Sequence, residues 1–403
     1  MKFSKLSQLF LVSTVGLLVA TLLTSCDIVT IDYVLVADSA GTGTGSAGQI
    51  QTFDADQATG ALRPGATAVP SGGVNPVSMA ITSDYANLYV ANAGNSSVVH
   101  FALSGSGILT QKDSITATTT PVAIAVNSSD TYLYVISGTT SATITAYPLS
   151  SGAIGSIVAQ TNLVVPGYGS DIIIPTGLTV LANSNAVFVT AYDQSAYNPG
   201  GTTTSNANPG WIFGFTVASG GALTPSSGSP YKAGVKPSAI ASDPTSRFVY
   251  VTDFASNQLI GYTVQSGSIL DFLINGPFRT GNEPIAITID PRGKFIYLAN
   301  ALDSSVTPYT IDLATGTPSS IVNVTGSQTD STDTQPVAIV VDASVGRFVY
   351  TANHLGNSVS GFELDANTGA LAVTTSTPYP TSASPTALVS VPHNNHAVQS
   401  VAP

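Results

Sequence analysis

Residues 284–300 read Pro-Ile-Ala-Ile-Thr-Ile-Asp-Pro-Arg-Gly-Lys-Phe-Ile-Tyr-Leu-Ala-Asn. A proline opens a short apolar run, a polar turn follows, and a second run rich in β-branched and aromatic residues ends in asparagine. Both runs have the composition and the turn boundaries that are typical of β-strands. The segment therefore predicts a β-hairpin.

The proline-led run recurs seven times, at spacings of 45 to 62 residues. Its copies are Pro76–Ile81, Pro121–Val126, Pro175–Val180, Pro237–Ile240, Pro284–Ile289, Pro336–Val341 and Pro385–Val389. A second strand follows each of the first six copies, and a third strand and a Gly-x-Leu or Gly-x-Ile turn into a fourth can be traced in most units. Four short strands in each unit of about 45 residues indicate the blades of a β-propeller.

The second strands carry sequences such as Tyr89-Val-Ala-Asn92 and Tyr297-Leu-Ala-Asn300. These stretches resemble the YVTN repeat, and nearly everything after residue 30 resembles the seven-bladed lactonase-type propeller family. The resemblance implies a propeller that opens lactone rings. Members of that family usually carry His and Arg near the channel, whereas the predicted inner strands here contain neither residue type.

The two ends of the chain complement each other. Tyr33–Asp38, Gln49–Phe53 and Gly60–Leu62 read as second, third and fourth strands without a first, and Thr386–Val391 reads as the missing first strand. We therefore expect an all-β, seven-bladed β-propeller of four-stranded antiparallel blades, closed by pairing the N- and C-terminal strands, which removes an open sheet edge. Residues 396–401 read as a surplus second strand, either a tail or a competitor of residues 33–38.

The N-terminus has the features of an export signal. Lys2 and Lys5 precede an apolar stretch that ends in Leu23-Thr24-Ser25-Cys26, which resembles the lipobox of bacterial lipoproteins. Cys26 is the only cysteine of the chain and the predicted lipidation site. The alternatives are an ordinary secretory signal with a chance cysteine and an uncleaved membrane anchor.

This interpretation divides the chain into residues 1–25 as a lipoprotein signal peptide, 26–32 as a lipid-anchored linker and 33–403 as a single propeller domain. We expect export across the cytoplasmic membrane and anchoring in the bacterial cell envelope through the lipid on Cys26, with the leaflet left open. Loss of two lysines with the signal peptide leaves nine basic against 22 acidic residues, a net charge of −13. Such a surface disfavours nucleic acid as a partner.

In a propeller, the loops that enter the innermost strands and the loops from second to third strands emerge on one face, around the channel mouth. This geometry gathers Lys236, Asp253, Asn300 and Asn353 as candidate ligand-binding residues. Asn and Asp recur at the ends of the second strands, so a turn-forming role is the alternative for the last three.

Glu283 and His354 depart from the repeat pattern at that face. A carboxylate and an imidazole there could act as general base and partner for attack of water on a lactone carbonyl, which makes them the candidate catalytic residues. The alternative is two solvated side chains on the rim. Residues 192–209 form an insertion that contains Tyr192 and is followed by Trp211. The two aromatic residues are a candidate platform for a carbohydrate or peptide. The alternative is that the insertion is a plain surface loop.

The sequence leaves three functions open. The favoured one is a binding or scaffold propeller at the cell envelope with a carbohydrate, lactone or protein ligand. The alternative is a lactone-ring-opening hydrolase, similar to lactonases and 6-phosphogluconolactonases, that uses Glu283 and His354. The third is a purely structural surface protein. No cofactor and no metal site are expected.

Overall fold

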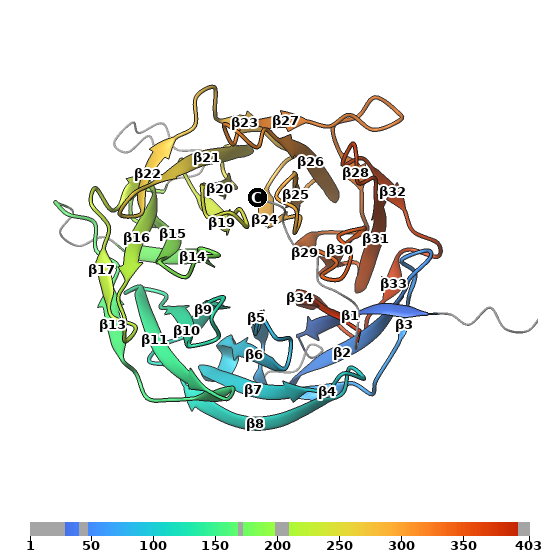
Figure 1. Ribbon diagram of the computed structural model, residues 1–403, viewed down its shortest axis with the longest axis horizontal. Helices are drawn as coiled ribbons and strands as arrows, with labels where there is room; N and C mark the ends of the chain where they lie inside the picture. The colour runs from blue at the N-terminus through green and yellow to red at the C-terminus, as the bar shows by residue number, and fades with distance from the viewer. Residues whose placement is uncertain (1–28, 40–46, 168–171, 198–208, 394–403) are drawn as a thin grey trace, which may run out of the picture.

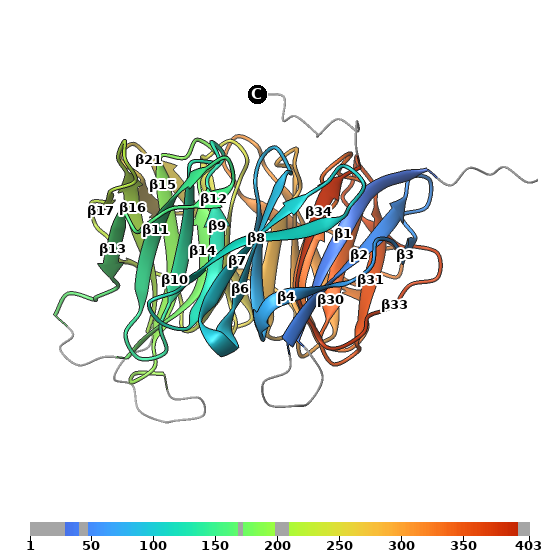
Figure 2. The same ribbon diagram turned by 90° about the horizontal axis from the view of Figure 1, so that it is seen from below.

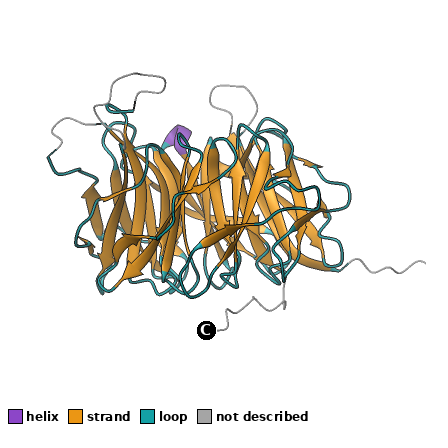
Figure 3. Cartoon of the chain, turned by 90° about the horizontal axis from the view of Figure 1, so that it is seen from above, coloured by secondary structure: helices purple, strands orange, loops and turns teal. Residues whose placement is uncertain are grey.

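The computed structural model describes residues 29–39, 47–167, 172–197 and 209–393. These residues form seven antiparallel sheets arranged radially in a ring (Figure 1). Among them, the single turn η1 (Ala93–Asn95) is the only helical segment (Figure 3). Within these residues no helix has the length and apolarity needed to cross a lipid bilayer. The predicted signal peptide, Cys26 and the surplus strand at residues 396–401 lie outside the described residues.

The first three blades follow each other along the chain. Blade 1 consists of β5 (Pro76–Ile81), β6 (Asn87–Asn92), β7 (Ser97–Leu103) and β8 (Leu109–Thr116). Blade 2 consists of β9 (Pro121–Val126), β10 (Tyr132–Ser137), β11 (Thr143–Ser150), β12 (Ala153–Ile154) and β13 (Ala159–Asn162). Blade 3 consists of β14 (Ile173–Val180), β15 (Ala186–Asp193), β16 (Gly210–Val217), β17 (Leu223–Pro225) and β18 (Tyr231–Lys232).

The next three blades repeat this order. Blade 4 consists of β19 (Pro237–Ser242), β20 (Phe248–Asp253), β21 (Gln258–Gln265), β22 (Ile269–Phe272) and β23 (Phe278–Arg279). Blade 5 consists of β24 (Pro284–Ile289), β25 (Phe295–Asn300), β26 (Ser305–Ile311), β27 (Pro318–Ser320) and β28 (Asp330–Ser331). Blade 6 consists of β29 (Pro336–Val341), β30 (Phe348–Asn353), β31 (Ser358–Leu364), β32 (Leu371–Val373) and β33 (Tyr379–Pro380).

Blade 7 joins the two ends of the chain. It consists of β34 (Pro385–Pro392) innermost, then β1 (Thr30–Asp38), β2 (Ala47–Asp56), β3 (Leu62–Pro64) and β4 (Val69–Val74). β1 pairs with β34 from Asp32↔Pro392 to Asp38↔Pro385. This pairing confirms the predicted closure and puts residues 33–38 in the second-strand position. In every blade except the first, the outermost strand is split into two short pieces that pair with the same third strand.

The hydrophobic core lies between the blades. Each of the seven blade interfaces has its own cluster of buried apolar side chains. In β1, Tyr33 and Leu35 pack against blade 1, whereas Val34 and Val36 pack against blade 6. Side chains alternate between the two faces of a strand, and both faces of β1 are buried, so its sequence is apolar without a polar alternation.

Two faces of the ring follow from the strand directions. At the mouth face the innermost strands begin and the second strands end; at the hairpin face the first and second strands are joined. The start of β1 lies beside the end of β34 at the hairpin face (Figure 2). Aspartates cap the hairpins there: the Asp290 carboxylate accepts from the backbone N–H groups of Lys294 and Phe295, at 2.6 and 2.8 Å.

Candidate functional site

The Asn and Asp side chains that end the second strands are buried. The Asp253 carboxylate accepts hydrogen bonds of 2.9 Å from the backbone N–H groups of Val235 and Lys236, which fixes the loop entering β19. Asn353 donates to the hydroxyls of Ser358 and Ser360, and Asn300 makes the same kind of bonds in blade 5. All three are 0% exposed, a placement that favours the turn-forming interpretation over ligand contact.

The Lys236 side chain lies in a cluster of aromatic rings at the mouth face. Its ammonium group is 5.4 Å from the ring centroid of Tyr192, 5.0 Å from that of Tyr197 and 4.7 Å from that of Phe254. All four side chains are half-buried. Cation–π attraction therefore positions the ammonium group while leaving it within reach of the mouth. We call these four residues the Lys236 cluster.

Glu283 lies next to this cluster, at the entrance to blade 5. Burial raises the pKa of Tyr197, and the charges of Asp253 and Glu283 raise it further. Tyr197 therefore keeps its proton at neutral pH and remains a hydrogen-bond donor, with its ring centroid 5.0 Å from the Lys236 ammonium group.

The backbone of Glu283 is held in a left-handed conformation, with φ of 56°. Its N–H donates to Oδ1 of Asn257 at 2.8 Å, Nδ2 of Asn257 donates to Oδ1 of Asn282 at 3.0 Å, and Nδ2 of Asn282 donates to Oδ1 of Asp303 at 2.8 Å. Each donor has one acceptor, so the chain of bonds fixes both amide orientations. Asn75 and Gln335, which hold the equivalent positions before β5 and β29, have the same conformation, with φ of 54° and 58°, so this backbone geometry belongs to the repeat.

His354 lies apart from Glu283. Its Nδ1 is 3.0 Å from the carbonyl oxygen of Pro385, which only accepts, so Nδ1 carries the proton and Nε2 is the basic nitrogen. The ring is thus directed at blade 7, whereas Glu283 adjoins blades 3 and 4. Among the described residues no hydrogen bond or ion pair joins Glu283 to His354. The sequence predicted that the two side chains face one funnel and act together. Both lie at the mouth face, and their joint role stays a prediction.

Trp211 does not form an exposed platform. It lies opposite Ala191 in the β15–β16 pairing and packs in the core between blades 2 and 3, 7% exposed. The ammonium group of Lys232 lies 3.6 Å from its ring centroid. The ring is buried because its position on β16 points between two blades. Residues 198–208 of the predicted insertion lie outside the described residues.

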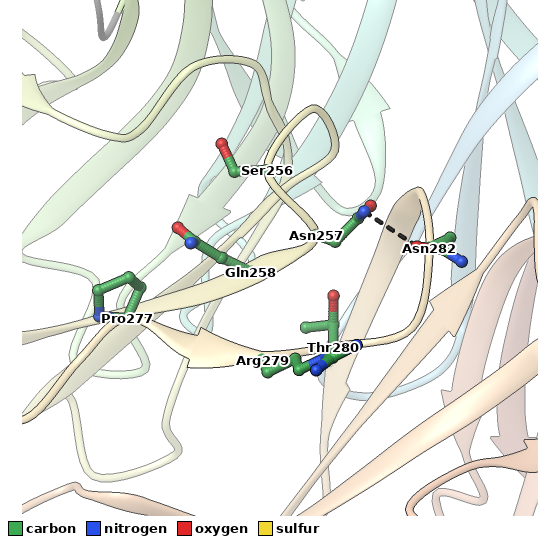
Figure 4. Close-up of a pocket in the computed structure, with 7 residues that line it drawn as sticks. All are labelled: Ser256, Asn257, Gln258, Pro277, Arg279, Thr280 and Asn282. Carbon is green, nitrogen blue, oxygen red and sulfur yellow. Dashed lines mark hydrogen bonds between the residues drawn. The ribbon is translucent and has the colours of Figure 1, made fainter.

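A polar pocket of about 370 Å³ opens beside the Asn257–Asn282 bond (Figure 4). Its lining comes from the loop between β20 and β21 and from the segment that leads into β24: Ser256, Asn257, Gln258, Pro277, Arg279, Thr280 and Asn282. Sequence reasoning missed Asn257, Arg279 and Phe254. The sequence did contain a signal for Phe254: this residue directly follows the predicted end of a second strand, and the second strands end at the mouth face.

No group of three or more His, Cys, Asp or Glu side chains in the described segments is arranged to hold a metal ion. The chemistry present at the mouth face includes the Lys236 ammonium group, tyrosine hydroxyls, amides, the His354 imidazole, the Arg279 guanidinium group and one half-buried glutamate. A carboxylate beside donors of this kind can activate water and stabilise a developing oxyanion.

Comparison with known proteins gives one family. The family model described as "Lactonase, 7-bladed beta-propeller" matches residues 46–168 and 225–389, more than half of the chain. No curated protein matches.

Similar solved structures share the fold. The periplasmic gluconolactonase of Pseudomonas aeruginosa is 18% identical, with a TM-score of 0.70 over 90% of this chain and 99% of that one. Two candidate 6-phosphogluconolactonases are also similar. The one from Bacteroides uniformis is 18% identical, with a TM-score of 0.70 over 90% of this chain and 100% of that one. The one from Bacteroides fragilis is 17% identical, with a TM-score of 0.69 over 90% of this chain and 98% of that one. At these identities the likeness concerns the fold.

Proposed function

Because the chain belongs to the seven-bladed β-propeller lactonase family, we propose that it adds water to a lactone ring at the mouth face. The observation that carries the proposal is Glu283, locked by Asn257 next to Tyr197 and the Lys236 cluster. The gluconolactonase and 6-phosphogluconolactonase names among its structural neighbours support a sugar lactone as the substrate. This proposal replaces the scaffold role that the sequence favoured.

In the proposed reaction Glu283 accepts a proton from water while the water oxygen bonds to the lactone carbonyl carbon. The Lys236 ammonium group and the Tyr197 hydroxyl donate to the carbonyl oxygen as its negative charge develops. The bond between the carbonyl carbon and the ring oxygen then breaks. The ring oxygen takes the proton back from Glu283, which leaves a hydroxy acid and the carboxylate of Glu283 restored.

Proton release from D-glucono-1,5-lactone and D-galactono-1,4-lactone, measured above the spontaneous rate, tests this reaction. Glu283→Gln should lower kcat/KM about 100-fold, since it removes the general base. The chain contains only one other glutamate, Glu363, which pairs with Arg347 in blade 6, so Glu363→Gln is a matched control that should retain full turnover. A folded protein without turnover, or equal rates for both variants, would refute the proposal.

Asn257 serves as a positioning residue in this proposal, because it acts through the backbone of Glu283. Asn257→Ala should lower kcat about tenfold with little change in KM. Asn257→Asp keeps an acceptor for the Glu283 N–H and should recover most of the rate. A purely structural role would instead lower the thermal stability of both variants without separating their rates.

A binding module without turnover is the second candidate, and the three aromatic rings around Lys236 favour it, since aromatic faces stack on sugar rings. Saturable binding of a sugar without hydrolysis, lost in Tyr197→Ala, would distinguish it from the hydrolase.

Export and lipid anchoring through Cys26 remain part of the proposed function. The described chain begins at Val29, and β1 starts at the hairpin face, so an anchor there would turn the mouth face away from the membrane. Radiolabelled palmitate should enter the wild-type protein in bacterial cells and not Cys26→Ser. Equal labelling, or none in either, would refute the anchor.

A further inference from the structure

Arg279 and Lys232 occupy equivalent places on the outer strands of neighbouring blades. Lys232 ends β18 and lies opposite Trp211, and Arg279 ends β23 and lies opposite Gln258. The backbone carbonyl of each accepts a tyrosine hydroxyl from the next blade, Tyr262 for Lys232 and Tyr309 for Arg279. The two cations thus share a backbone position and differ in what their side chains face.

The ammonium group of Lys232 lies over the indole ring of Trp211, at 3.6 Å. Arg279 lies opposite Gln258 instead of an aromatic residue, and within the described residues its guanidinium group has neither an acidic partner nor a ring. Three other arginines, at the hairpin face, are engaged: Arg247 with the Leu313 carbonyl, Arg292 with Asp290 and Arg347 with Glu363. The donors of Arg279 are therefore available to a ligand.

Arg279 lines the polar pocket at the mouth face, and it is the only charged residue of that lining. The Asp303 carboxylate is turned to Asn282, from which it accepts bonds of 2.6 and 2.8 Å. Asn257 and Asn282 are bonded to each other, so their amides form a fixed wall. Gln258, Ser256 and Thr280 add neutral polar groups, and the volume of about 370 Å³ is in the range of small-molecule sites.

We propose that this pocket binds the carboxylate of an acidic saccharide, with the Arg279 guanidinium group pairing with both carboxylate oxygens and the neutral side chains contacting hydroxyls. Guanidinium matches the planar carboxylate in a bidentate geometry. One arginine in an otherwise neutral lining, on a protein of strongly negative net charge, suits a monoanion better than a dianionic phosphate. The site goes beyond lactone opening and does not depend on turnover.

Calorimetric titration of the chain from residue 27 onward tests the pocket with three probes on one sugar ring. These are methyl α-D-galactopyranosiduronate, the neutral methyl α-D-galactopyranoside and galactose 6-phosphate. We expect the uronate to bind most tightly. Arg279→Ala should weaken uronate binding about tenfold or more, because a charge-assisted bond is lost. The uronate affinity of Arg279→Lys should lie between those of the wild type and Arg279→Ala.

Lys232→Ala is the matched control, since it removes the same charge from the equivalent position of blade 3 and should leave uronate binding unchanged. Four results would overturn the proposal: no uronate binding to the wild type, equal binding of the neutral galactoside, tighter binding of the phosphate, or unchanged binding by folded Arg279→Ala. The melting temperature of each variant verifies that it is folded, as expected for an exposed side chain on a strand end.

Discussion

The Tyr350 hydroxyl donates a 2.8 Å hydrogen bond to the carbonyl oxygen of Gly60, 290 residues away in the sequence. The bond joins blade 6 to blade 7. Tyr89, Tyr250 and Tyr297 make the same bond to Gly152, Gly316 and Gly369 of their own following blades. The tyrosine of the repeat and the glycine before the outer strand thus form one inter-blade connection at four interfaces, and the interface between blades 6 and 7 is one of them.

Tyr350→Phe should lower the free energy of unfolding by about 1–3 kcal/mol, since it leaves the buried Gly60 carbonyl without its partner. Tyr297→Phe is the control at an interface between blades that are consecutive in sequence, with a 2.9 Å bond to Gly369, and we expect the same loss. Urea unfolding measures both. A loss in Tyr297→Phe alone would mean that the ring does not close as described.

Gly60→Ala should destabilise the protein more than Gly267→Ala. Both glycines have positive φ, 66° and 75°, so either substitution costs about 1–2 kcal/mol of backbone strain. A Cβ on Gly60 would also lie 2.3 Å from Cδ1 of Phe348, whereas one on Gly267 meets nothing within 4 Å. We expect about 3 kcal/mol or more for Gly60→Ala, and equal urea midpoints would contradict this packing.

Much of this architecture follows from local sequence. The innermost strands β5, β9, β19, β24, β29 and β34 begin at the predicted prolines, because a proline can open a strand where no N–H is required. Only β14 begins earlier, at Ile173, two residues before the predicted Pro175. Sequence did not predict the split outer strands, whose segments share no pattern. It also predicted that Glu283 and His354 lie on one face, but it could not predict the distance between them, because that distance depends on how blades 5 and 6 pack. The Arg279 pocket brings together residues 256–258 and 277–282, which are separated in the sequence, and therefore left no local signal.

The stability of the ring should depend on pH through Asp32, a fully buried residue at the start of β1. Burial and, to a smaller extent, the nearby Asp342 carboxylate raise its pKa from 3.8 to about 8, against the lowering effect of the 2.6 Å bond from Ser344. Between these values the folded protein holds a proton that the unfolded chain has released. The free energy of unfolding therefore falls as pH rises from about 4 to 8.

Asp32→Asn should remove this loss and raise Tm by about 2 °C or more at pH 8, with little effect at pH 4. Thermal melts at both pH values measure the difference. Exposed Asp312 is the opposite case, because the N–H groups of Thr315 and Ala314 lower its pKa. Asp312→Asn should bring no gain at pH 8. A lower Tm for Asp32→Asn at pH 8 would show that its carboxylate is needed in ionised form.

Truncation at the C-terminus tests which strand completes blade 7. A chain that ends at Ser384 loses β34, so β1 keeps an open inner edge and the clusters on both sides lose Ala387, Leu388 and Val391. We expect this chain to aggregate, since an exposed edge beside apolar residues pairs with other chains. A chain that ends at His393 keeps β34 and should melt like the full-length protein, because β1 already fills the second-strand position. Size-exclusion chromatography and thermal melts compare the two. A stable monomer ending at Ser384, or a lower Tm for the chain ending at His393, would assign part of the closure to residues 394–403 instead.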